Sequence, residues 1–244
     1  MKMEMCFPRE FQDAQKRNLP LVMVGGTVEY HGPHCSYGCD SLIAEGLVEL
    51  LAKEKEMIVA PTVHYSPSSY AVGDETSGTV HVEENAFENY LYYIFYSYLA
   101  SGFRNIYVVI HHQFEQESLM PMTLSYMKAA KRATMQYLEK TKGQGWWGSE
   151  SYASYYEELE GESNPFAWIK VIPSMSAAVQ TEVGYDHAGE FESSMLMALY
   201  PEAVDLSRID EKYHWFTQSA RKATPEHGKK MVELSLAYLR EAIR

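Results

Sequence analysis

Side chains that can bind metal ions crowd into one short stretch of the chain, residues 24–41 (VGGTVEYHGPHCSYGCDS). Glu29 and His31 stand two positions apart, so in an extended segment both side chains project to one side. The Gly-Pro pair that follows favours a turn, which lets Asp40 return beside them. Carboxylate oxygens and imidazole nitrogens are common ligands of divalent cations in proteins. The stretch therefore predicts a metal site supplied by Glu29, His31 and Asp40.

Two other interpretations of this stretch are open. Asp40 precedes a segment with helical spacing of apolar residues, so its carboxylate could cap a helix N-terminus instead of binding metal. His31, Cys35 and Cys39 could form a structural zinc site, but such sites have four N or S ligands and usually a second pair further along. The sequence holds no second cysteine pair. We favour the carboxylate site, because a strand end has no structural need for so many titratable groups.

The spacing of apolar residues along the chain indicates the strands and helices that must position these side chains. Short apolar runs predict buried strands at 19–26, 57–65, 104–112 and 166–175, and helical spacing predicts helices at 41–56, 83–102, 118–141, 189–200 and 225–243. Strands that alternate with helices favour a parallel sheet with helices on both faces. The predicted fold class is α/β, with three α/β/α layers and a mostly parallel sheet. Residues 142–165, polar and rich in aromatic residues, are interpreted as an insertion.

Two further polar clusters follow predicted strands: residues 111–117 (HHQFEQE) and residues 183–194 (VGYDHAGEFESS). Ligands of open parallel sheets bind beyond the carboxyl ends of the strands, where the loops converge. We therefore expect both clusters to lie beside Glu29, His31 and Asp40.

Composition limits the function classes. The chain has 244 residues, of which 46% are hydrophobic, which favours one domain over residues 1–244. The net charge of −12 argues against a nucleic-acid partner. No apolar run is long enough to span a membrane, and the first residues lack the apolar core of a signal peptide. With only three cysteines, the sequence predicts a cytoplasmic protein.

The chain resembles the creatininase family of metal-dependent amidohydrolases over its whole length. VEYHGPHCSYGCD is similar to the family signature E-Q-H-G-P-H-L-P-L-G-T-D, and three later segments match further family motifs in order: SGTVHV at 77–82, GYDHAGEFESSMLMALYP at 184–201 and TPEHGKKM at 224–231. In this alignment Cys35 and Cys39 stand where the family has Leu and Thr, so the family pattern gives them no ligand role. The resemblance implies a creatininase-like fold.

The resemblance also implies roles for single residues. Glu29 matches a ligand of one metal, His31 a ligand of the other, and Asp40 the carboxylate that bridges both. One or two divalent ions per subunit, Zn and/or Mn, would activate a hydroxide and polarise a carbonyl. His187 matches the histidine that transfers protons, with Asp186 beside it. Glu192, further along, is a candidate ligand or a partner of a ligand.

The cluster at 111–117 departs from the family pattern N-G-H-x-x-N. An ungapped alignment places Gln113 at the position of the ligand His and Glu115 at that of the ligand Glu. Alternatively, His111 or His112 supplies the nitrogen. Side chains alternate along a strand, so His111 and Gln113 would share a face while His112 points away, unless the strand has already ended. We expect Gln113 and Glu115 to face the metals, with His111 as second choice and both histidines as supporting residues.

The resemblance implies a small polar cyclic substrate, and most directly a cyclic amide whose C–N bond is hydrolysed. A cyclic polyol diketone of the 3-dehydro-scyllo-inosose type, opened by C–C cleavage, is the alternative, and a catalytically silent relative that only binds a small molecule is a third. The candidate substrate-binding residues are Thr79, Phe114, Trp146, Trp147 and Tyr185. Family members assemble from several subunits, so we expect a homo-oligomer.

Overall fold

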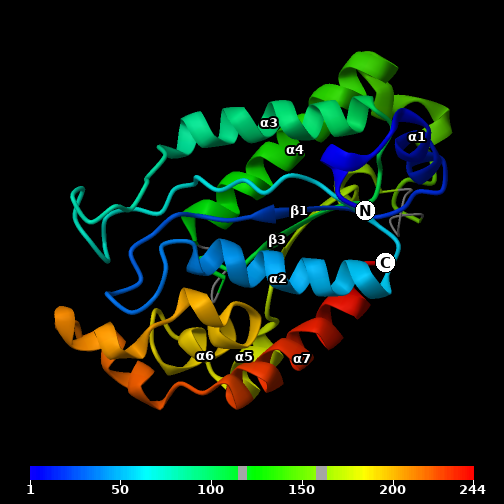
Figure 1. The fold of residues 1–244 in the computed structure, drawn as a ribbon. Coiled ribbons are helices and arrows are strands. Elements are labelled where there is room, and N and C mark those ends of the chain that lie inside the picture. Colours follow the sequence, from blue (N-terminus) through cyan, green and yellow to red (C-terminus); the bar gives the residue numbers. More distant parts are fainter. Residues whose placement is uncertain (115–119, 158–163) are drawn as a thin grey trace.

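A parallel sheet runs through the middle of the computed structural model, which describes residues 1–114, 120–157 and 164–244 (Figure 1). The sheet has the order β2-β1-β3-β4 and every neighbouring pair is parallel. Its strands are β1 (Leu21–Gly25), β2 (Ile58–Val59), β3 (Ile106–Ile110) and β4 (Ile169–Pro173). Because the strands are parallel, their carboxyl ends meet at one edge of the sheet.

Helices cover both faces of the sheet (Figure 1). On one face, α3 (Glu84–Ala100) and α4 (Pro121–Lys142) pack on Leu21 and Met23 of β1. On the other face, α2 (Cys39–Glu54), α6 (Glu190–Leu199) and α7 (Pro225–Ala242) pack on Val22 and Val24. Successive side chains of one strand thus enter two separate apolar cores, as the period of two requires. The predicted three-layer α/β/α architecture is confirmed.

Shorter elements complete the described chain. Two are α-helices, α1 (Pro8–Lys16) and α5 (Ala177–Val183), neither of which the apolar pattern predicts. The others are 3-10 helices: η1 (Met3–Met5), η2 (Trp146–Gly148), η3 (Glu150–Tyr152), η5 (Pro165–Ala167), η6 (Pro201–Ala203), η7 (Leu206–Glu211) and η8 (Trp215–Lys222).

The second strand is much shorter than the predicted 57–65. Only Ile58 and Val59 pair with β1 along a continuous ladder, and beyond them the segment keeps one isolated bridge, between Val63 and Gly25. After Ala60, whose N–H donates to the carbonyl of Val22, the next donor to β1 is Val63 and not Thr62, so an extra residue interrupts the regular alternation of the ladder. The segment still follows the edge of the sheet, and its continuation leads into the loop at 66–82 beside the functional site.

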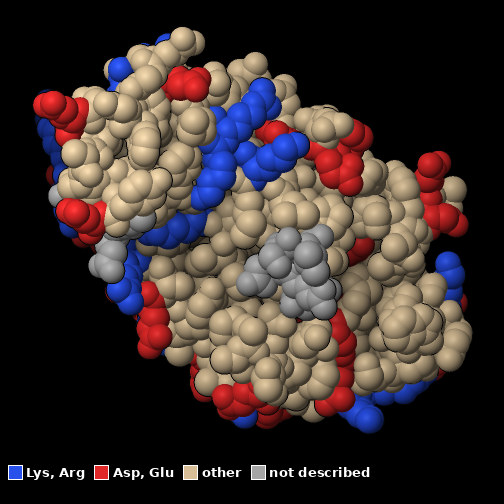
Figure 2. Space-filling model, turned by 180° about the vertical axis from the view of Figure 1, so that it is seen from behind, with Lys and Arg blue, Asp and Glu red and all other residues tan. Residues whose placement is uncertain are grey.

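Basic side chains are unevenly distributed over the surface. Figure 2 shows Lys and Arg gathered in a band on the face opposite to that of Figure 1, with Asp and Glu scattered around it. Helix α4 carries Lys128 and Arg132, and both pair with Glu88 of α3. The absence of a nucleic-acid partner stays a prediction.

In the part of the chain that the structure describes, no helix has both the length and the apolar character needed to cross a lipid bilayer.

Candidate metal centre

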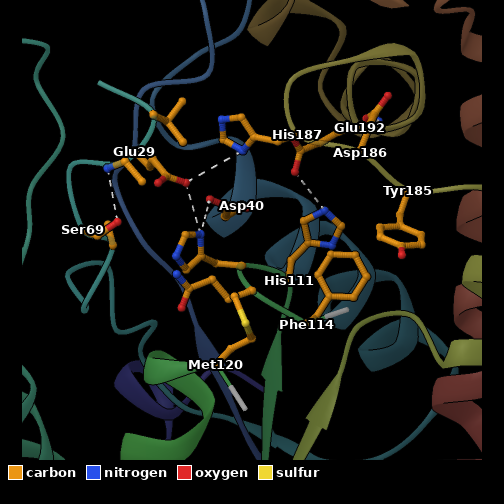
Figure 3. A pocket seen from close by; sticks show the side chains of 15 residues that line it. Glu29, Asp40, Ser69, His111, Phe114, Met120, Tyr185, Asp186, His187 and Glu192 are labelled. Atoms are coloured by element: carbon orange, nitrogen blue, oxygen red, sulfur yellow. Dashed lines mark hydrogen bonds and ion pairs between the residues drawn. The ribbon is translucent and has the colours of Figure 1, made fainter. Parts of the chain in front are cut away.

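A cavity of about 310 Å³ lies where the carboxyl ends of β1 and β3 meet the loop that precedes α6. Its acidic and histidine lining residues are Glu29, Asp40, His111, His112, Asp186, His187 and Glu192. Figure 3 shows them converging on one volume, with Glu29 and His187 on one side and His111 and Glu192 on the other. All three polar clusters of the sequence thus meet at one site, as the topology of a parallel sheet favours.

The loop after β1 is fixed at two glycines. A Cβ atom on Gly26 would lie 2.2 Å from Oγ of Ser41, so only glycine fits where the loop passes the first turn of α2. Gly32 has a φ of +74°, a conformation that favours glycine, and it turns the chain back toward α2. The backbone N–H of Glu29 donates to the carbonyl of Tyr37 at 3.0 Å. These contacts hold Glu29, His31 and Asp40 close together.

One potential ligand group consists of Glu29, Asp40 and His112, whose ligand atoms all lie within 4.8 Å of one another. Nδ1 of His112 is 3.2 Å from Oε2 of Glu29 and 3.3 Å from Oδ2 of Asp40. Burial by itself lowers the pKa of His112, but the two carboxylates outweigh burial and raise the pKa to about 10. The group therefore favours a positive charge between its two carboxylates.

A second group, Asp40, His111 and Glu192, shares Asp40 with the first. Nε2 of His111 is 3.4 Å from Oε1 of Glu192, and Nδ1 of the same ring is 2.7 Å from Oγ of Ser174. The backbone N–H of Ala188 donates to Oε2 of Glu192 at 2.6 Å. Because Asp40 belongs to both groups, a single carboxylate can contact two ions.

His31 lies between these groups with its ring orientation fixed. Its Nδ1–H donates to the carbonyl of Glu29 at 3.0 Å, which leaves Nε2 at 3.5 Å from carboxylate oxygens of both Asp40 and Glu192. Burial lowers the pKa of His31, but Asp40 and Glu192 together raise it well above its usual range. Both Nε2 of His31 and Oδ2 of Asp40 are buried and have no hydrogen-bond partner. Unpaired buried polar atoms of this kind are costly unless a ligand satisfies them.

The donor set fits divalent cations. Three carboxylates, those of Glu29, Asp40 and Glu192, are at most 5% exposed, and buried carboxylates are stable only when positive charge compensates them. No Lys or Arg lines the described cavity. The compensating positive charge must therefore come from protonated histidines or from bound cations. Imidazole nitrogens with carboxylate oxygens suit Zn²⁺ and also Mn²⁺.

His187 and Asp186 occupy different positions relative to this centre. Nε2–H of His187 donates to the carbonyl of Tyr30 at 3.3 Å, and its Nδ1 faces Oε2 of Glu29 at 4.0 Å. The Asp186 carboxylate accepts from the backbone N–H groups of Phe191 and Glu192 at 3.2 and 3.1 Å, so it caps the first turn of α6. Burial raises the pKa of Asp186. A catalytic role stays a prediction for both residues.

The segment after β3 differs from the sequence expectation. β3 ends at Ile110, so strand alternation no longer governs the next residues, and His111 and His112 both face the carboxylates. Gln113 has a φ of +51°, and its side-chain oxygen lies 3.5 Å from the backbone N–H of Met122, at the start of α4. Gln113 lines the cavity, but its described side-chain contact is with α4. His112, by contrast, contacts both Glu29 and Asp40. Glu115 lies outside the described residues.

The candidate substrate-binding residues divide into two sets. Phe114 and Tyr185 line the cavity, and Phe114 stacks on His111 with ring centroids 4.6 Å apart. Thr79 does not line it, and its hydroxyl accepts from the backbone N–H of Tyr30 at 3.0 Å. Trp146 and Trp147 pack instead on tyrosines of their own segment, Tyr152, Tyr155 and Tyr156.

One wall of the cavity, formed by the loop at 66–82 and the start of α4, has no signal in the sequence. Ser68, Ser69, Ala71, Val72 and Met120 line the cavity there. A Ser- and Gly-rich loop gives no pattern that separates lining residues from others. Ser174, by contrast, is a polar residue directly after β4, and the rule that located the other clusters could have located it too.

Ser174 is expected to orient His111, which in turn contacts the candidate ligand Glu192. Ser174→Ala removes the partner of Nδ1, so the ring loses its fixed orientation and the affinity for the ion at Glu192 should fall roughly 10- to 100-fold. Isothermal titration of metal-free protein with Zn²⁺ measures this change, and Ser176→Ala, which loses a helix cap rather than a contact to His111, is the control. Equal zinc affinities in Ser174→Ala and wild type would contradict the role.

Comparison with known proteins identifies the family. A model of the creatininase family, described as creatinine amidohydrolase, matches residues 5–243. A structure described as "Creatininase Mn" superposes with a TM-score of 0.71 at 17% identity, covering 99% of this chain and 98% of that one. A creatininase mutant complexed with creatine also has a TM-score of 0.71, at 18% identity and 100% and 97% coverage. A creatininase mutant of a "Zn-Zn type" has a TM-score of 0.69, at 17% identity and 99% and 98% coverage.

A comparison with curated proteins gives no match. The structural likeness at these low identities shows the fold, and the family model, which spans nearly all of the sequence, shows the kinship. The chain belongs to the creatininase family.

Proposed function

We propose that the chain is a metal-dependent hydrolase that opens a small, uncharged or cationic cyclic amide. The observation that carries the proposal is the pair of ligand groups that share Asp40 at the cavity wall, one with Glu29 and His112 and the other with His111 and Glu192. The names of similar structures, which mention manganese, a zinc pair and creatine, support this choice of metals and of substrate type. When bound, two divalent cations supply acidification of a water molecule and polarisation of a substrate carbonyl.

We assign Glu29, Asp40 and His112 to one ion, and His31 and Glu192 to the other, with Asp40 shared and His111 beside Glu192. This assignment keeps the sequence expectation for Glu29, His31 and Asp40 and replaces Gln113 by His112. Its support is the contact of His112 with both Glu29 and Asp40, at 3.2 and 3.3 Å.

His187 is proposed as the residue that moves the proton. Its Nε2–H is held by the Tyr30 carbonyl, so Nδ1, which faces Glu29, is the nitrogen free to exchange protons. In amide hydrolysis, water adds its oxygen to the carbonyl carbon while the C–N bond breaks and the nitrogen gains a proton. Nδ1 of His187 would accept a proton from the attacking water and deliver it to that nitrogen.

The charge of the cavity limits the substrate. Its lining includes four carboxylates, Glu29, Asp40, Asp186 and Glu192, and no Lys or Arg. The segments outside the described residues, EQESL at 115–119 and ELEGES at 158–163, contain no Lys or Arg either. The described cavity wall therefore offers no Lys or Arg side chain to pair with a substrate carboxylate or phosphate.

The wall opposite the carboxylates favours an amide over a polyol. Ala71, Val72, Phe114 and Met120 present apolar surface to the cavity, with Ser68, Ser69 and Gln113 as the polar side chains among them. A polyhydroxylated ring needs a hydrogen-bonding partner for most of its hydroxyl groups. Hydroxyl groups that face this wall would lose their hydrogen bonds to water and gain none from the apolar side chains. A ring with one carbonyl and apolar atoms has no such need. The C–C hydrolase is therefore the second candidate. A homo-oligomeric state and a cytoplasmic location stay predictions.

A substrate panel tests the proposal. Wild-type protein supplied with Zn²⁺ or Mn²⁺ is expected to hydrolyse neutral cyclic amides such as creatinine, and the same ring with an added carboxylate should have a kcat/KM at least about tenfold lower, because no Lys or Arg of the lining compensates the loss of water around that carboxylate. Turnover is followed by chromatography of the opened product. Cleavage of a cyclic polyol diketone but of no amide would replace the proposal by C–C hydrolysis. Binding without turnover of either class would indicate the catalytically silent relative.

A further inference from the structure

Cys39 lies directly behind the proposed metal centre. It is the first residue of α2, immediately before Asp40, and its side chain is completely buried. Its sulfur, a ring nitrogen of His31 and a carboxylate oxygen of Glu192 all lie within 4.8 Å of one another. Sulfur, imidazole nitrogen and carboxylate oxygen are the three ligand types of protein-bound zinc.

His31 supplies an independent observation at the same place. The residue is 1% exposed, and its Nε2 has no hydrogen-bond partner while it points at Glu192 from 3.5 Å. Ligand atoms of a tetrahedral zinc site lie about 2.0 to 2.3 Å from the ion, and hence roughly 3.3 to 3.8 Å from one another. The separation of His31 and Glu192 already falls in that range. The thiol, within 4.8 Å of both atoms, completes the group if it approaches them to the same range.

We propose that Cys39 is a thiolate ligand of the ion that His31 and Glu192 hold, an inference that rests on the metal centre proposed above. On binding, the thiol proton of Cys39 passes to solvent and a sulfur–metal bond forms. Neither Cys39 nor His31 lines the cavity, whereas Glu192 and Asp40 do. Two ligands therefore reach this ion from the interior of the protein and two from the cavity wall. With four protein ligands, the ion would have to become five-coordinate to bind substrate or water on the cavity side.

A thiolate ligand has a consequence for metal selection. Soft sulfur ligands favour Zn²⁺, whereas carboxylate and water ligands suit Mn²⁺. The family signature has Thr at the position of Cys39. A thiolate at this position would therefore give the ion held by His31 and Glu192 a stronger preference for Zn²⁺ in this chain than the signature residue would give.

Cys35 provides a matched control. It stands four residues before Cys39, and its sulfur lies 3.5 Å from Oγ of Ser193. Among the described residues, it belongs to none of the groups whose ligand atoms come within 4.8 Å of one another. A variant at Cys35 thus removes one thiol and keeps the proposed ligand.

Cobalt substitution tests the proposal, because a bound thiolate gives Co²⁺ a charge-transfer absorption in the near ultraviolet that N and O ligands do not give. Wild type and Cys35→Ser loaded with Co²⁺ should show this band, and Cys39→Ser and Cys39→Thr should lose it. Zn²⁺ affinity at this position should also fall at least about tenfold in both Cys39 variants, and less for Mn²⁺.

The outcomes separate this inference from the proposal on which it rests. Wild-type protein that binds Co²⁺ without the band would overturn the role of Cys39 and leave the metal centre intact. A band that disappears in Cys35→Ser and persists in Cys39→Ser would also overturn it. If wild type binds no Co²⁺ at all, the metal centre itself fails. The wild-type spectrum decides the question even if a Cys39 variant does not fold.

Discussion

Asp40→Ala is expected to remove both divalent ions and to reduce turnover by about 10³-fold or more. The carboxylate of Asp40 lies 3.3 Å from Nδ1 of His112 and 3.5 Å from Nε2 of His31, so it belongs to both ligand groups. Without it, each ion loses one anionic ligand, and the groups no longer share an atom that holds the ions together. Metal ions supply several kcal/mol of transition-state stabilisation, and the loss of this stabilisation corresponds to a decrease in turnover of about 10³-fold or more.

Glu45→Gln is the control for this variant. Glu45 is a carboxylate on the same helix, α2, and its nearest described partner is His64 at 3.8 Å, away from the cavity. The control should keep both its metal content and its activity. Asp40→Ala protein that still binds two ions would show that Asp40 does not bridge them. The structure already excludes the alternative that Asp40 is the helix N-cap, because α2 begins at Cys39 with Gly38 as its N-cap residue.

His187→Ala is expected to keep both ions and to lose roughly 10²- to 10⁴-fold in kcat, the usual size of a general acid–base contribution. The side chain is 29% exposed, and its nitrogen nearest to the carboxylates is 4.0 Å from Glu29, so its removal takes away a proton carrier rather than a ligand. KM should change much less than kcat. Added imidazole should restore part of the activity, because the vacated space can admit a free base.

His227→Ala is a matched control for this prediction. His227 also contacts a backbone carbonyl through Nε2, that of Val183 at 3.1 Å, but it lies on α7 and does not line the cavity. Its replacement should leave kcat unchanged. A His187→Ala protein that loses metal together with activity would instead make His187 a ligand, consistent with its place in a group with Glu29 and His31.

The sequence located the edge of the sheet at which these residues meet. Continuous apolar runs ending near Gly25, Ile110 and Pro173 predicted β1, β3 and β4, and their alternation with helices predicted that they pair in parallel. Polar residues placed directly after such strands had to converge, because parallel strands end at the same edge. Family signature letters added the roles of Glu29, His31 and Asp40, which strand geometry alone does not provide.

The choice between His112 and Gln113 could not be made from the sequence. It depends on where β3 ends, because one residue more of strand would turn His112 away from Asp40. The chain leaves the strand at Ile110 and reaches a φ of +51° at Gln113, a local conformation with no apolar pattern of its own. The predicted substrate contact of Trp146 and Trp147 depended on the course of a long connection, and in its described part these residues pack on tyrosines of the same connection.

Metal analysis of the wild-type chain beside Asp40→Ala is the most direct measurement of the central claim, a two-ion hydrolytic centre built on a shared Asp40. Both proteins are purified without chelator, supplied with Zn²⁺ or Mn²⁺, freed of excess metal and analysed by mass spectrometry. The proposed centre predicts about two divalent ions per wild-type chain and close to none in the variant. Wild-type protein that retains no divalent ion, or a variant that retains as many as the wild type, would contradict it.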